Sequence, residues 1–220
     1  MAANLIAQLQ NEFSDDVIGR LASWLGETPA KTQRAVGYAI PAVVGGLFQK
    51  AQASGGAQDL LGTLQGGGFD GKSMGDMASL ARSATRSSDL VRSGGTVVSL
   101  VFGGRQDTLA DSIATASGLG KQSSSSLLAL TASYVASLVS KEATAAGGFN
   151  ATSIADLLGA QGPHLARVAP SSLSQLLGVS SRERVDEPAR AYERVPGTPR
   201  RAYEGEEKRG ALSWLKWGLP

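Results

Sequence analysis

The amino-acid sequence predicts an all-α protein, an internally duplicated multi-helix bundle followed by a disordered charged tail. Apolar residues recur at helical spacing, a Gly-Gly-Phe pattern occurs twice, and the composition changes near residue 180. The 220 residues include 28 glycines and no cysteine, which excludes disulfide frameworks, Cys-ligated metals and thiol catalysis. The single histidine, His164, excludes multi-His metal sites. We expect no catalytic residue, cofactor or metal.

Two short helices are expected at the start of the chain. The first covers residues 4–12. Ser14 then suits the N-cap of a second helix, because the carboxylates of Asp15 and Asp16 follow in its first turn. Gly26 is the residue type that ends a helix in the left-handed conformation.

A long helix is expected next. Thr28 and Pro29 suit its N-cap and first position, and the apolar pattern continues to about Ala51. Pro41 lies inside the pattern and is expected to kink the helix or split it in two, because proline lacks the backbone N–H.

The rest of the body is predicted from the same signals. Residues 96–102 are rich in β-branched types, so a strand is the alternative there. A second long helix is expected after the loop Ser123–Ser126 and runs to about Ala145. The remaining expected helices cover residues 57–64, 74–84, 89–102, 107–116, 154–158 and 173–177.

The chain repeats a pattern of Gly-Gly-Phe, Asp or Asn, two variable positions, Ser, apolar, small and Asp. It occurs at 67–77 and at 147–157, and residues 25–28 align with 119–122 upstream. We infer two related helical units, 1–103 and 104–178, the second packed on the first. The repeat anchors are Phe69, Ser73, Asp76, Phe149, Ser153 and Asp156.

One segment matches the phosphate-binding loop of nucleotide hydrolases, G-x-x-x-x-G-K-[ST], through Gly66, Gly71, Lys72 and Ser73. In the second copy, Ala and Thr stand at the positions of Gly71 and Lys72. The two copies therefore share packing features rather than phosphate-binding ones. Nucleotide binding or hydrolysis stays an alternative.

The end of the chain differs in composition from the body. Residues 1–180 have no net charge, whereas 181–220 hold nine basic and seven acidic residues. We expect a disordered polyampholyte linker over 179–210. Trp214, Lys216 and Trp217 give residues 211–220 the composition of a membrane–water interface. We expect a juxtamembrane segment, cut before a membrane span; a free amphipathic tail is the alternative.

The body resembles the YidB-like family of bacterial proteins of unknown function over about residues 1–178. The resemblance is carried by Asn4-Leu5-Ile6, Phe13-Ser14, residues 25–32 and 39–47, and the later Gly-Gly-Phe turns. It implies an all-α domain of small helical bundles with no assigned catalytic residues. Some relatives carry this domain ahead of a membrane span and an OmpA-like peptidoglycan-binding domain, which this sequence does not contain.

These observations predict a non-catalytic protein-interaction or scaffold module at the cytoplasmic face of the inner membrane. We expect a protein partner or self-association, and contact with the membrane surface through the C-terminal segment. The 21 basic and 19 acidic residues nearly balance, and the basic ones in the body are scattered, so no nucleic-acid partner is expected. A carrier of lipid or another apolar ligand between the two units is a further alternative.

Overall fold

The computed structural model describes residues 4–69 and 84–168. They belong to a compact unit, Met1–Arg182, and the second unit, Glu183–Pro220, lies outside the described residues. Both described ranges are helical and contain no strand, which confirms the all-α class. The elements are α1 (Leu5–Glu12), α2 (Asp15–Leu25), α3 (Pro29–Gln52), α4 (Gly56–Gly66), α6 (Ala84–Phe102), the 3₁₀ turn η1 (Gly103–Arg105), α7 (Gln106–Ser117), α8 (Lys121–Gly147), α9 (Ala151–Gly159) and α10 (Gly162–Val168).

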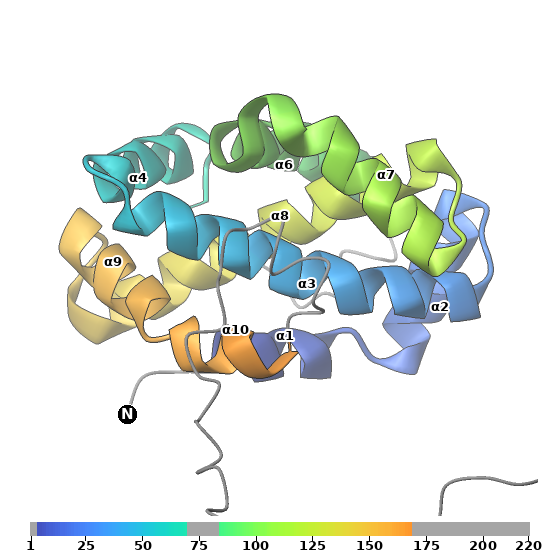
Figure 1. Ribbon diagram of the computed structural model, residues 1–220, viewed down its shortest axis with the longest axis horizontal. Helices are drawn as coiled ribbons and strands as arrows, with labels where there is room; N and C mark the ends of the chain where they lie inside the picture. The colour runs from blue at the N-terminus through green and yellow to red at the C-terminus, as the bar shows by residue number, and fades with distance from the viewer. Residues whose placement is uncertain (1–3, 70–83, 169–220) are drawn as a thin grey trace, which may run out of the picture. The chain divides into compact units, whose positions relative to one another are not determined.

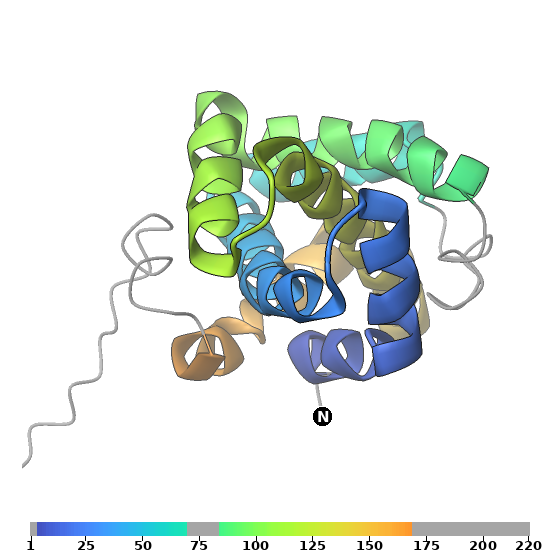
Figure 2. The same cartoon turned by 90° about the vertical axis from the view of Figure 1, so that its right-hand side faces the viewer.

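The two long helices, α3 and α8, lie at the centre of the compact unit (Figure 1). Every residue of α8 from Leu127 to Ser140 is buried, because α3, α6, α7 and α9 all contact this helix. The view turned by 90° shows the shorter helices arranged around α3 and α8 (Figure 2). A helix that is buried around its whole circumference needs neighbours on every side.

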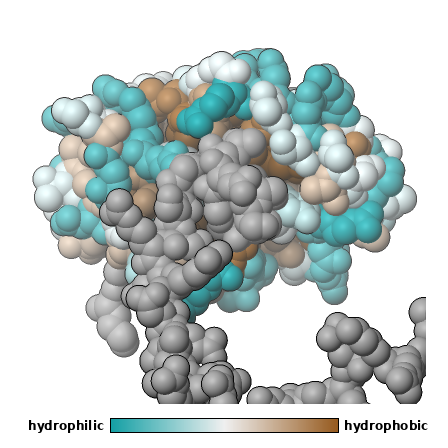
Figure 3. Space-filling view, in the orientation of Figure 1, coloured by the Kyte–Doolittle hydropathy of each residue, from teal (hydrophilic) through white to brown (hydrophobic). Residues whose placement is uncertain are grey.

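One hydrophobic core joins the two predicted copies. The buried cluster extends from Leu5 to Leu165 and takes side chains from helices on both sides of residue 103. Within the described ranges Val168, 41% exposed, is the one large hydrophobic residue classed as exposed. Figure 3 shows brown residues along the line where α6 meets α3 and α7, bordered by hydrophilic ones. Apart from Val168, the large hydrophobic side chains of these ranges are buried or partly buried.

Helix ends agree with the expected signals at Thr28 and Gly26, whereas Ser14 is the N-cap of α2 but its side chain makes no capping hydrogen bond. Asn4, Thr28 and Asn150 each accept a hydrogen bond from a backbone N–H in the first turn of α1, α3 and α9. Gly26 ends α2 with φ of 69°, in the left-handed region. Pro41 does not split α3, which is continuous from Pro29 to Gln52. The residues around Pro41 are buried, and this packing stabilises the helix although one backbone hydrogen bond is missing.

One local expectation was wrong, and one alternative is excluded. Ser123–Ser126 belongs to the first turns of α8, which begins at Lys121. These hydroxyls make tertiary contacts instead, since Ser124 Oγ donates to the carbonyl of Ala110 at 2.7 Å. Residues 96–102 are helical, because Val97 and Val98 are buried in the core and packing outweighs their strand preference.

Other helix boundaries differ from the expected ones by a few residues. α6 begins at Ala84, five residues before the expected start at 89. Almost all of the helix expected over 74–84, and all of the one expected over 173–177, lie outside the described residues.

Candidate functional site

Two turns with similar caps connect a short helix to a long one. Gly26 ends α2 and Gly118 ends α7, with φ of 69° and 78°, and Thr28 and Gly120 are the N-caps of α3 and α8. In each turn a left-handed glycine ends the short helix, and the N-cap of the long helix follows two residues later.

The two turns contact each other. Gly120 N–H donates to Glu27 Oε1 at 2.7 Å, and Ser123 Oγ donates to the carbonyl of Leu25 at 3.3 Å. Lys31 Nζ donates to Glu27 Oε2 at 3.2 Å. The hydrogen bond from Gly120 is the main reason that the pKa of Glu27 lies below its ordinary value, with Lys31 adding to the effect. This cluster is a structural joint between the two predicted copies.

The predicted repeat anchors are described in part. Phe69 is buried and Phe149 packs half-buried against the same core, each directly after a glycine with positive φ, Gly68 and Gly148. In the second copy, Ser153 and Asp156 lie in α9, where Ser153 N–H donates to the N-cap Asn150 at 2.9 Å. Ser73 and Asp76 of the first copy lie outside the described residues.

The residues of the phosphate-loop match are also described in part. Gly66 is the last residue of α4, so a helix precedes the motif where phosphate loops follow a strand. Gly71, Lys72 and Ser73 lie outside the described residues, as do Trp214, Lys216 and Trp217. His164 is within α10. In 4–69 and 84–168 we find neither a potential metal-binding group of three side chains nor a helix suited to spanning a bilayer.

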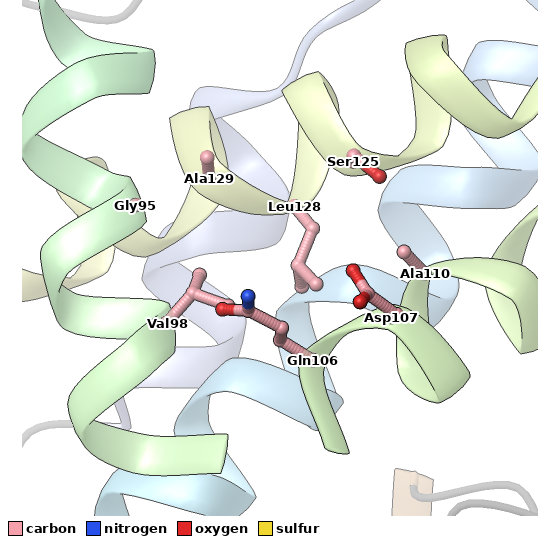
Figure 4. A pocket seen from close by; sticks show the side chains of 8 residues that line it. All are labelled: Gly95, Val98, Gln106, Asp107, Ala110, Ser125, Leu128 and Ala129. Carbon is pink, nitrogen blue, oxygen red and sulfur yellow. The ribbon is translucent and has the colours of Figure 1, made fainter. Parts of the chain in front are cut away.

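Sequence reasoning missed a pocket at the junction of α6, α7 and α8 (Figure 4). Its volume is about 180 Å³. The three helices supply residues that no short sequence motif joins, which is why no spacing indicated it. Its lining consists of Gly95, Val98, Gln106, Asp107, Ala110, Ser125, Leu128 and Ala129.

The apolar wall of the pocket depends on a close crossing of α6 and α8. A Cβ atom at Gly94 would overlap the carbonyl oxygen of Ala129 and lie 2.8 Å from Ser133 Oγ. Ser133 Oγ in turn donates to the carbonyl of Leu90 on α6. Glycine at position 94 therefore allows the two backbones to approach and sets the apolar side of the pocket.

The polar side of the pocket comes mainly from the start of α7. Ser99 Oγ donates to Gln106 Oε1 at 3.0 Å, and the Gln106 amide nitrogen points toward Leu128 (Figure 4). The carboxylate of Asp107 points into the pocket on the side of Ser125. Asp107 lies in the first turn of α7, where the helix dipole favours a negative charge. It makes no ion pair with any described residue.

The described residues thus form an all-α bundle that has one shared core and a small surface pocket. The chain belongs to a family described as "Bacterial protein of unknown function (DUF937)", whose model matches residues 7–142. The match includes both turns and all residues that line the pocket. No curated protein and no solved structure matches the chain.

Proposed function

We propose that this protein is a non-catalytic interaction module that binds another polypeptide through the pocket between α6, α7 and α8. The size of the pocket carries the proposal. Its volume of about 180 Å³ equals the volume of roughly six water molecules. Small-molecule and cofactor sites have volumes of about 300–1,000 Å³. A pocket of this size suits one anchoring side chain of a protein partner.

The surroundings of the pocket support the same function. Its walls are three packed helices, and Leu128 and Ala129 belong to the fully buried part of α8. Such a site is formed before binding, so little conformational entropy is lost when a side chain enters it. Among the described residues Val168 is the one large hydrophobic side chain that is exposed, which favours recognition through a pocket.

A photo-reactive residue at Thr96 tests this proposal. Thr96 is exposed on α6 beside Gly95, so a partner seated in the pocket lies within reach of the probe. In bacteria that express the full chain, we expect irradiation to give a covalent adduct with one other polypeptide. Mass spectrometry of the adduct also distinguishes a different protein from a second copy of this chain.

Two controls make the cross-linking result specific. The same probe at Gln58, exposed on α4, reports random collisions and should give no such adduct. Gly95→Leu places a side chain in the pocket and should abolish the adduct at Thr96. An adduct that survives this substitution, or no adduct at Thr96, would contradict the proposal.

We further propose that the module is held at the cytoplasmic face of the inner membrane by residues 211–220. Trp214 and Trp217 with Lys216 between them support this location, because tryptophan and basic residues are enriched at membrane interfaces. The resemblance to the YidB-like family supports this location as well, because some relatives carry the domain ahead of a membrane span.

Vesicle flotation tests the membrane location. The full chain should float with vesicles of phosphatidylethanolamine and phosphatidylglycerol. Replacing Trp214 and Trp217 together with serine should lower the partition coefficient about tenfold or more, since burial of a large apolar side chain contributes roughly 1.5–3 kcal/mol. Tyr203→Ser, an aromatic change elsewhere in the tail, is the matched control. Equal flotation of all three proteins would contradict membrane binding through this segment.

A further inference from the structure

The pocket combines an apolar wall with a carboxylate that has no cationic partner among the described residues. Val98, Ala110, Leu128 and Ala129 supply apolar groups, and Asp107 and Ser125 supply oxygen atoms. Figure 4 places Asp107 and Ser125 on the same side of Leu128. An occupant therefore needs an apolar stem and, at its end, a positively charged donor.

We propose that the pocket binds the lysine side chain of a partner polypeptide, with its methylene stem against Val98, Leu128 and Ala129 and its ammonium group on Asp107 and Ser125. This inference rests on the proposed function and names the chemistry of the partner. A lysine side chain has four carbons and ends in a compact group with three N–H donors. A stem and head of this size suit a pocket of about 180 Å³.

The same edge of α7 already attracts a lysine of this chain. Lys121 Nζ lies 2.9 Å from Asp111 Oδ2, one turn after Asp107. The pKa of Lys121 is raised, first by the hydrogen bond and charge of Asp111 and to a smaller extent by the charge of Asp107. Asp111 has its cation within the chain, whereas the carboxylate of Asp107 remains available to a second one.

The geometry favours a tethered lysine over a free amine. Asp107 is exposed, so the polar end of the pocket is at the surface, where a polypeptide can approach. A free amine would bury only its short stem in about 180 Å³. A side chain on a partner adds backbone contacts around the mouth, which offset the entropy lost on binding.

Titration of the full-length protein with Nα-acetyl-lysine N-methylamide, followed by NMR, tests the inference. We expect saturable shifts of amide signals from Gly95, Ala110 and Ala129. The norleucine analogue, which lacks the ammonium group, should bind about fivefold more weakly, since an exposed ion pair contributes up to about 1 kcal/mol. Absence of saturable binding, or equal binding of the two analogues, would overturn the inference.

Matched variants separate charge from shape. Asp107→Asn should weaken lysine-analogue binding about fivefold. Asp111→Asn removes an acid that does not line the pocket and should change the affinity by less than twofold. Gly95→Leu should abolish binding and leave the protein folded, because a Cβ there meets no atom within 4 Å. Gly62→Leu, with equal space on α4, should bind like the unchanged protein. A different order of these variants would overturn the assignment.

Two comparisons identify which proposal fails. If butylamine binds more tightly than the lysine analogue, the occupant is a free amine and the lysine assignment is overturned. If Gly95→Leu abolishes the Thr96 cross-link but Asp107→Asn leaves it unchanged, the interaction function stands and the lysine chemistry is wrong. Loss of the cross-link in both variants, with Asp111→Asn unaffected, supports both.

Discussion

Replacing Gly94 with alanine is expected to lower the free energy of unfolding by about 3 kcal/mol, the upper end of the usual range for overpacking. The added Cβ would overlap the Ala129 carbonyl oxygen and lie 2.7 Å from its carbonyl carbon. Because these atoms belong to the backbone of a buried helix, α6 and α8 must separate to relieve the overlap. The melting temperature should fall by about 6–12 °C in a thermal unfolding experiment.

Gly95→Ala is the matched control for this prediction. Gly95 is the next residue of α6, and a Cβ there meets no atom within 4 Å. Alanine is favoured over glycine inside a helix, so this variant should gain about 0.5–1 kcal/mol. A gain of stability in both variants would show that helix propensity, rather than the crossing at Ala129, determines the outcome.

Replacing Gln161 with leucine is expected to lower the free energy of unfolding by about 2–3 kcal/mol and to loosen α1. Gln161 is completely buried between α9 and α10. Its Oε1 accepts the N–H of Leu5 at 3.0 Å, and its Nε2 donates to the carbonyl of Leu157 at 3.0 Å. Leucine fills similar space but leaves both backbone groups without these partners.

Urea unfolding combined with hydrogen exchange measures both effects. The Leu5 amide should exchange faster in Gln161→Leu, because it loses its acceptor. Gln10→Leu changes an exposed glutamine of α1 itself and should alter stability by less than about 0.5 kcal/mol. Unchanged exchange at Leu5 would mean that α1 is held by apolar packing alone.

Local signals predicted most of the helices. The cap Thr28 and the left-handed Gly26 act between neighbouring residues, so the sequence reveals them directly, whereas Asn4 was expected inside the first helix and is its N-cap. The expected loop at Ser123–Ser126 was wrong, and the alternative strand at 96–102 is excluded in favour of the expected helix, because partners far along the chain determine both segments. Ser123 donates to Leu25, and the valines of 96–102 pack into the shared core.

The pocket could not be predicted in the same way. Its apolar wall requires the close approach of α6 to α8 at Gly94, and its polar side requires the start of α7 to lie beside Ser125. In the sequence, Gly94 is one glycine among 28, and Asp107 reads as an ordinary acid near the start of a helix. The one motif that suggested a binding site, the phosphate-loop match that begins at Gly66, lies in a different part of the chain.

By itself the sequence determined the helical class, the caps and the order of most of the helices, because helix formation depends on residues three or four positions apart. Only the tertiary structure decided that both predicted copies share one core, that Glu27 accepts a hydrogen bond from Gly120, and that α6, α7 and α8 form a pocket. These features arise from contacts between residues distant in the chain. Such contacts depend on burial and steric fit, and the local sequence pattern does not specify them.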